Sequence, residues 1–111
     1  MKTKEIRIGG GEAWQCLVAE TTRERTRGLL GREGLESGVF MRLSPCNMIH
    51  TFGMRFAIDL VFVDKRNRVV KVIRDLRPGR MAWGGWMART TLEAQSGWMP
   101  EIPIGSLLET L

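Results

Sequence analysis

Three side chains that could bind metal or transfer protons lie four residues apart near the middle of the chain: Cys46, His50 and Met54. They share one face of either a strand or a helix. Cysteine, histidine and methionine are soft ligands that suit copper. A strand, however, separates positions four apart by about 13 Å, so only a helical turn or tight loop would bring them to one ion. We therefore expect no metal site, and a wall or rim position for the three side chains.

His50 is the only histidine, and its unperturbed pKa near 6.5 would suit a general base. A base also needs a nucleophile and an orienting group within hydrogen-bond reach. Cys46, Thr51 and Asp59 are candidates, but their spacing does not show that they converge. An enzyme centred on His50 and Cys46 is therefore an alternative hypothesis, and no catalytic residue is assigned.

Asp59 interrupts the apolar run at residues 57–63. A buried, unpaired carboxylate would cost several kcal/mol or shift its pKa, so Asp59 needs a partner. Arg55 on the same face is one candidate, and backbone N–H groups of a neighbouring loop are another. A structural role is favoured, and a ligand-positioning role is the alternative.

The segment RMAWGGWMAR at residues 80–89 contains two tryptophans, Trp83 and Trp86, between two arginines. Its paired glycines indicate a loop that can move. Tryptophan and methionine are enriched in adaptable binding surfaces, and arginine beside aromatic rings can stack on nucleobases or face anionic headgroups. We expect a flap that closes the mouth of a barrel, with ligand binding as the alternative role.

The elements that must position these residues are short. Thr21 and Glu24 form a capping-box pattern, which predicts one short helix that Gly31 can end. Strands are predicted at residues 4–8, 13–18, 37–43, 57–64, 68–76 and 90–95 and near the C-terminus. In the segment 68–76, alternation predicts that Val70, Val72 and Leu76 share one face.

A chain of 111 residues with 43% apolar and 26% charged residues is typical of one globular domain, residues 1–111. The pattern predicts an α+β, mostly β fold. We expect a small curled sheet or partly open barrel of about seven short strands with one short helix.

The formal net charge is +5, and the arginines are scattered along the chain. Scattered cations indicate that the positive charge serves a solvated surface. The alternative is that the arginines bind nucleic acid or an anionic surface. No apolar stretch approaches the roughly 20 residues of a membrane-spanning helix. The N-terminus does not read as an export signal, so we expect a cytoplasmic protein, although a removed signal stays open. Cys16 and Cys46 are expected to be free thiols.

Several motifs match one known family. They are Arg25-x-x-Gly28-Leu29-Leu30-x-Arg32, IHTFGMRFAIDLVFVD at residues 49–64, Leu76 with Pro78, Leu92-Glu93-x-x-x-Gly97, and Ile104-Gly105. Over residues 12–111 the chain resembles the family catalogued as domain of unknown function 192. The resemblance implies a small, mostly β domain of bacteria and archaea without an established activity. Ala57 stands where a proline is usual, and Ser106 stands where an aspartate is usual.

The leading functional hypothesis is a non-enzymatic binding module that holds a small molecule or peptide segment and needs no cofactor. Loops on a rigid scaffold tend to carry function, and the unusual residues of this chain cluster in loops. The hypothesis requires His50 and the Trp83–Trp86 loop to meet at one mouth of the sheet. The candidate ligand-binding residues are His50, Thr51, Met54, Arg55, Asp59, Trp83, Trp86 and Arg32.

Overall fold

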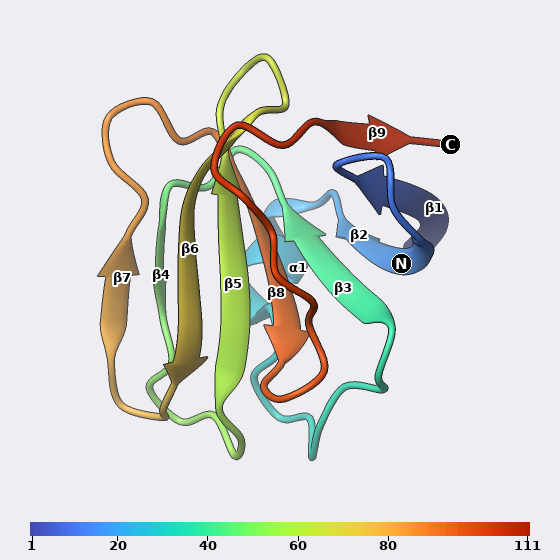
Figure 1. Ribbon diagram of the computed structural model, residues 1–111. Helices are drawn as coiled ribbons and strands as arrows, with labels where there is room; N and C mark the ends of the chain where they lie inside the picture. The colour runs from blue at the N-terminus through green and yellow to red at the C-terminus, as the bar shows by residue number, and fades with distance from the viewer.

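The computed structural model describes residues 1–111 and contains nine strands and one short helix (Figure 1). The elements are β1 (Lys2–Ile8), β2 (Ala13–Ala19), α1 (Thr22–Arg27), β3 (Val39–Leu43), β4 (Met48–His50), β5 (Ile58–Val63), β6 (Val69–Leu76), β7 (Met81–Trp83), β8 (Thr90–Gln95) and β9 (Leu108–Thr110).

Seven of the strands form one curled sheet in the order β6-β5-β8-β3-β2-β1-β9 (Figure 1). Strands β2 and β3 run parallel, and all other neighbours in the sheet are antiparallel. The sheet curls into a half barrel, with α1 behind it in the view of Figure 1. The predicted α+β, mostly β architecture is therefore confirmed.

An apolar cluster packs on each face of the sheet, which explains why the inner strand β5 is buried at every position. Leu60 and Phe62 pack into one cluster, on the side of α1. Val61 and Val63 alternate with them and pack into a second cluster on the opposite face. One strand thus serves two cores, because successive side chains of a strand point to opposite faces.

Strands β4 and β7 form a separate two-stranded ribbon beside the sheet. Met48 pairs with Trp83, Ile49 with Ala82, and His50 with Met81. Ile49 and Ala82 are buried in the first apolar cluster, whereas the flanking residues of both strands are exposed. The sequence of residues 80–89 predicts a loop, and β7 within it is not predicted, because three residues are too few for a periodic pattern to stand out.

Strand β6 departs from the predicted alternation. Val70 packs with the first cluster and Val72 with the second, so the prediction that they share a face is wrong. The cause is a register shift: Phe62 pairs with Lys71, but Val63 pairs with Val69, which leaves Val70 as an extra residue. An extra residue of this kind interrupts the alternation, so residues two apart across the β-bulge point to opposite faces of the sheet.

Helix α1 begins as predicted and ends earlier. The Thr21 hydroxyl accepts a hydrogen bond from the Glu24 N–H, and the Glu24 carboxylate accepts one from the Thr21 N–H, so the capping box is confirmed. The helix ends at Arg27, not near Gly31, because Gly28 takes a φ of 50° that a helix cannot continue. The early end turns Leu29 into the core, where it is 2% exposed.

Candidate functional site

Three polar side chains of β8, spaced two apart, lie on the face of the sheet that α1 covers: Thr91, Glu93 and Gln95. The Thr91 hydroxyl donates to the backbone oxygen of Cys46 at 3.1 Å. The Gln95 side-chain oxygen accepts from the N–H of Leu35 at 2.7 Å. Each of these two side chains therefore fastens a neighbouring loop to the sheet.

Glu93, which lies between Thr91 and Gln95 on β8, holds no loop in this way. Its side chain makes no hydrogen bond or ion pair with the protein, although the residue is only 4% exposed. Burial raises the pKa of the Glu93 carboxyl from 4.5 to about 7, because a carboxylate away from water is costly. The fully enclosed polar side-chain atoms without a partner are Arg7 Nε and Trp98 Nε1, so the Glu93 carboxyl, although it has no protein partner, keeps access to the space beside it.

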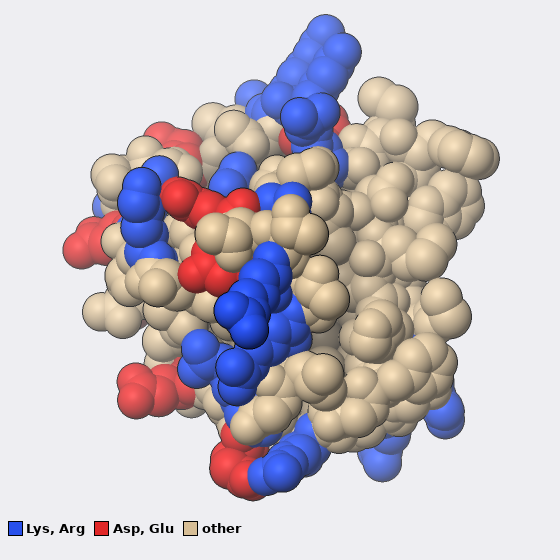
Figure 2. All heavy atoms as spheres, turned by 180° about the vertical axis from the view of Figure 1, so that it is seen from behind, with Lys and Arg blue, Asp and Glu red and all other residues tan.

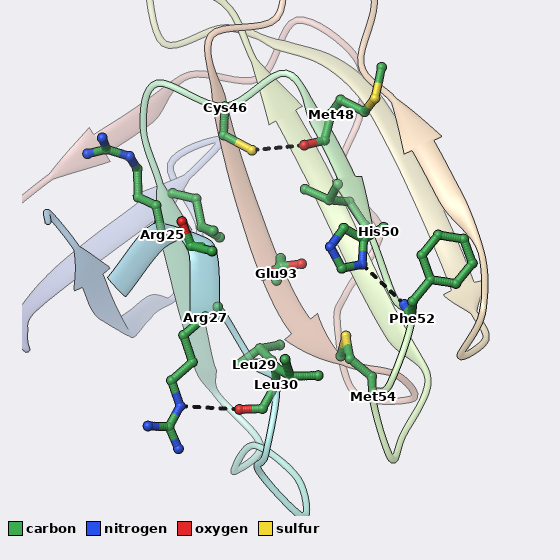
Figure 3. A pocket seen from close by; sticks show the side chains of 14 residues that line it. Arg25, Arg27, Leu29, Leu30, Cys46, Met48, His50, Phe52, Met54 and Glu93 are labelled. Atoms are coloured by element: carbon green, nitrogen blue, oxygen red, sulfur yellow. Dashed lines mark hydrogen bonds between the residues drawn. The ribbon is translucent and has the colours of Figure 1, made fainter. Parts of the chain in front are cut away.

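The Glu93 carboxyl faces a cavity of about 230 Å³, here named the Glu93 cavity (Figure 3). The cavity lies between α1 with the turn that follows it and the segment of β4 with its flanking turns. Its apolar wall is formed by Leu29, Leu30, Leu43, Ile49 and Met54. A carboxyl at the bottom of an apolar cavity is a usual arrangement for holding a small ligand in one orientation.

His50 stands on the wall opposite α1, at the end of β4 (Figure 3). Its Nδ1 accepts a hydrogen bond from the N–H of Phe52 at 3.3 Å, and the two rings stack with centroids 5.4 Å apart. An Nδ1 that accepts carries no proton, so the neutral ring carries its proton on Nε2. The cavity therefore has a carboxyl at its base and an imidazole ring on its wall.

Cys46 and Met54 also line the Glu93 cavity, so the three soft side chains spaced four apart do come to one place. The tight turn at Gly53, with a φ of 78°, folds the chain after β4 back over the cavity. The Cys46 thiol donates to the backbone oxygen of Met48 at 3.3 Å and not to His50. No group of three or more histidine, cysteine, aspartate or glutamate side chains is placed to hold a metal ion.

Two arginines of α1 contribute to the cavity wall without aiming their charges into it. The Arg25 guanidinium donates to the backbone oxygen of Glu20 at 2.7 Å, and the Arg27 Nε donates to that of Leu30 at 3.4 Å. Figure 3 shows both guanidinium groups turned away from the cavity. The interior of the cavity is therefore governed by Glu93 and not by the positive charge of the protein.

Thr51 and Asp59, two of the predicted ligand-binding residues, are held inside the protein. The Thr51 hydroxyl donates to the backbone oxygen of Arg77 at 2.6 Å and accepts from the N–H of Arg80 at 2.9 Å, which clamps the turn before β7. Asp59 accepts from the N–H groups of Asp75 at 2.8 Å and Gly97 at 3.4 Å. Both residues are at most 2% exposed and outside the Glu93 cavity.

Asp59 pairs with a different cation from the predicted candidate, Arg55. Its carboxylate lies 3.8 Å from the guanidinium of Arg74 on the neighbouring strand. Arg55 pairs with Glu33 at the surface instead, so the prediction of an Arg55–Asp59 pair is wrong, while the prediction of backbone N–H partners is confirmed. The chain turns sharply between Arg55 and β5, and residues four apart no longer share a face there.

Arg32 and the two tryptophans also lie outside the Glu93 cavity. Arg32 borders a separate depression with Gln15 and Glu36. Trp83 and Trp86 pack edge to face, with ring centroids 5.1 Å apart, on the outer side of the ribbon. Neither tryptophan is among the residues that line the cavity with His50, so the expectation that they share its mouth is not met, although Met48, the pairing partner of Trp83, does line the cavity.

The loop between β7 and β8 is also fixed in place and not a flap. Gly84 is buried, and a Cβ on it would collide with the Phe62 ring and lie 2.7 Å from the Cβ of Ala88. Its N–H donates to the backbone oxygen of Asn47 at 2.7 Å. The paired glycines thus serve close packing, which the sequence pattern alone does not distinguish from mobility.

Glu93 was absent from the predicted site residues. The available signal was the one that singled out Asp59, a carboxyl inside a short β-prone run, TTLEAQ. The two carboxyls differ only in their surroundings: Asp59 accepts hydrogen bonds from the backbone, whereas Glu93 faces a cavity. That difference depends on which loops cover each strand.

Two solved structures are similar to this fold. A protein of unknown function from Novosphingobium aromaticivorans DSM 12444 superposes with a TM-score of 0.85 and 19% identity, covering 96% of this chain and 84% of that one. A candidate transcription regulator from Sinorhizobium meliloti 1021 superposes with a TM-score of 0.86 and 15% identity, covering 98% and 94%. At these identities the similarity shows the fold alone.

A search of the curated proteins finds no significant match. The family model of domain of unknown function 192, described as "Uncharacterized ACR", matches residues 4–109. That match includes β2 to β8, the helix, most of β1 and β9, and all residues that line the Glu93 cavity. The chain therefore belongs to the family of domain of unknown function 192.

Proposed function

We propose that this protein is a binding module whose Glu93 cavity holds a small molecule, or one side chain of a peptide, with a hydrogen-bond donor on an apolar body. The carrying observation is the Glu93 carboxyl, buried, unpartnered and directed into the cavity. A hydroxyl or ammonium group on the ligand would satisfy it.

The cavity dimensions limit the ligand. Pockets for drug-sized molecules measure about 300–1,000 Å³, and the Glu93 cavity, at about 230 Å³, lies below that range. A short alkyl chain with one polar end fits such a space. The apolar walls from Leu29, Leu43 and Ile49 favour the alkyl part, and Glu93 favours a donor over an acceptor at the inner end.

Binding is better supported than catalysis by the hydrogen bonds around the cavity. The Cys46 thiol is engaged with a backbone oxygen, and His50 Nδ1 is engaged with a backbone N–H. No hydrogen bond joins Cys46, His50 and Glu93 to one another, whereas a nucleophile, base and orienting group act through such contacts. The proposal therefore gives these residues positions in a binding wall.

Three probes of equal chain length test the proposal: n-butylamine, n-butanol and n-butyrate. Their binding is followed by NMR through the methyl group of Met54, which lines the cavity. The amine and the alcohol are expected to shift this signal, and the carboxylate to leave it unchanged. Because ionised Glu93 attracts the ammonium, the affinity for butylamine should rise from about pH 6 to about pH 8, whereas that for butanol should change little.

Glu93→Leu is the decisive variant, and Glu101→Leu, which removes an exposed carboxylate outside the cavity, is its matched control. The first should lose the butylamine response and the second should keep it. Equal shifts with all three probes, or a butylamine response that survives in Glu93→Leu, would contradict the proposal.

A further inference from the structure

A feature outside the Glu93 cavity is the exposed tip between β7 and β8. Trp86 is 89% exposed and Met87 is 66% exposed, and Trp83 beside them is 41% exposed. Large apolar side chains at such exposure are costly in water unless something covers them. The three side chains are here named the tryptophan tip.

The backbone that carries the tryptophan tip is fixed to the rest of the protein on both sides. Before the tip, Gly84 packs against Phe62. After it, Ala88 is buried, and the N–H of Arg89 donates to the backbone oxygen of Val63 at 2.7 Å. The tip is therefore held outward before any partner arrives, and binding to it would order little additional chain.

Cations surround the same end of the molecule. The contact between Arg89 and Val63 puts the tip beside the turn from β5 to β6, which carries exposed Lys65 and Arg66. The ammonium of Lys71 donates to the backbone oxygen of Trp83 at 2.8 Å. Figure 1 shows that the turn and the loop extend from the same end of the sheet.

Negative charge is sparse at this end. No acidic residue occurs between Leu76 and Leu92. Asp64 is the acidic residue of the neighbouring turn, and its carboxylate accepts the N–H groups of Arg66 and Arg68 within that turn. Seen from the side of α1, the surface over the ribbon is largely free of charge and is bordered by lysine and arginine side chains (Figure 2).

We propose that the tryptophan tip, with Lys65, Arg66, Lys71 and Arg89, docks on the surface of an anionic lipid bilayer. Tryptophan prefers the headgroup level of a bilayer, where its ring is half apolar and its N–H stays wet. Basic side chains beside it gain from the negative surface potential of anionic lipids. The tip is a projection and not a groove, so its shape suits shallow insertion into headgroups better than the burial of a peptide.

The experiment uses the full chain and vesicles of two compositions, phosphatidylcholine alone and an equal mixture of phosphatidylcholine and phosphatidylglycerol. Cosedimentation measures binding, and quenching of tryptophan fluorescence by brominated lipid measures insertion. The protein is expected to sediment with the anionic vesicles, with quenched fluorescence, and to stay in solution with phosphatidylcholine alone. Added salt should weaken the binding by screening the cations.

Two variants separate the apolar and the charged contributions. Trp86→Ser should abolish the quenching and most of the sedimentation, and Ile104→Ser, which removes another exposed apolar side chain, is its control. The double variant Lys65→Gln, Arg66→Gln should weaken binding by roughly five-fold for each cation removed. Lys2→Gln, Lys4→Gln has the same net charge and should bind as the unmodified protein does.

Several outcomes would overturn the proposal. They are no binding to anionic vesicles, equal binding to both compositions, or equal losses in the Lys2, Lys4 control. A dimer in light scattering that Trp86→Ser dissociates would make a second copy of the chain the occupant of the tip. Binding to DNA that Trp86→Ser removes, in a protein that does not sediment with vesicles, would assign the tip to nucleic acid.

Discussion

At the scale of single residues, two carboxyls inside the sheet have opposite surroundings. Asp59 accepts hydrogen bonds from two backbone N–H groups and lies 3.8 Å from the guanidinium of Arg74. Glu93 has no such contact and is stabilised in its neutral form. A structural carboxyl and a ligand-facing carboxyl are thus told apart by their hydrogen bonds and not by their burial, which is nearly equal.

The raised pKa of Glu93 predicts how stability depends on pH. Because the folded protein holds this proton up to about pH 7 and the unfolded chain releases it near 4.5, the folded state binds more protons between these values. The contribution of Glu93 is therefore fully present below pH 4.5 and is lost as pH rises through about 7. The free energy of unfolding should fall by about 3 kcal/mol across this window.

Urea unfolding of the unmodified protein and of Glu93→Gln, measured at several pH values, checks this expectation. Glutamine has the size of the neutral acid and does not titrate, so the difference between the two stabilities should change across the window. A difference that stays constant with pH would show that Glu93 titrates normally in the folded protein.

The two free cysteines should differ in reactivity. Burial raises the pKa of the Cys16 thiol to about 11, and the residue is 0% exposed, so it has almost no accessible thiolate at neutral pH. Cys46 is only partly buried. We expect iodoacetamide to label Cys46 in the folded protein and Cys16 only after unfolding, as measured by peptide mass spectrometry. Rapid labelling of folded Cys46→Ser would contradict this.

At the scale of elements, the Thr51 hydroxyl helps to hold the turn that joins β6 to the ribbon of β4 and β7. Thr51 Oγ1 both donates to Arg77 and accepts from Arg80, and these contacts hold the turn that leads into β7. Thr51→Val keeps the shape and removes both hydrogen bonds, so the Arg77 carbonyl and the Arg80 N–H lose their side-chain partner. The free energy of unfolding should fall by about 1–3 kcal/mol. Thr51→Ser keeps the hydroxyl, so its free energy of unfolding should fall less. Equal falls in the two variants would show that the effect comes from packing and not from the hydrogen bonds.

The loop after β7 offers a second test of packing. A Cβ at Gly84 meets the Phe62 ring, which is 0% exposed and has no room to move. Gly84→Ala should therefore destabilise the protein by about 1–3 kcal/mol. Gly11→Ala is the control, because its Cβ meets only the Ile8 oxygen at 3.7 Å. A neutral Gly84→Ala would mean that the loop can shift, as the sequence pattern suggested.

At the scale of the whole molecule, the two apolar clusters share the strands of one sheet. Leu60 and Phe62 of β5 contribute to one cluster, and Val61 and Val63 to the other, so neither cluster survives loss of the strand. No helix of the structure is long and apolar enough to span a membrane. Because the two clusters share strands, the stability of each depends on those strands.

Residues 1–111 should consequently unfold as one cooperative unit. Trp14 and Trp98, 5.0 Å apart between ring centroids, report on the second cluster, and the methyl group of Met41 reports on the first. In a Trp83→Phe, Trp86→Phe background, tryptophan fluorescence and methyl NMR should give the same urea midpoint. Two separate midpoints would mean that the clusters form independent units.

Local chemistry was sufficient to predict the start of the helix and the strands of the main sheet, but not β4 or β7. The capping box of Thr21 and Glu24 lies within four residues, and the hairpin of β5 and β6 follows from two Val/Ile-rich runs around one turn. The mostly β fold follows from many such short runs in a small chain. In β6, however, even local alternation failed at Val70, because a bulge depends on how the partner strand is paired.

The functional surfaces were decided by tertiary structure. Glu93 reads in the sequence as one more residue of a strand, and it becomes a candidate only because Gly28, 65 positions earlier, lies beside its carboxyl and leaves a cavity. Trp83 does not line that cavity, although Met48, with which it pairs, does. Periodicity and turn residues report short-range sterics, whereas a cavity or an exposed tip depends on contacts between distant segments, which no local pattern encodes.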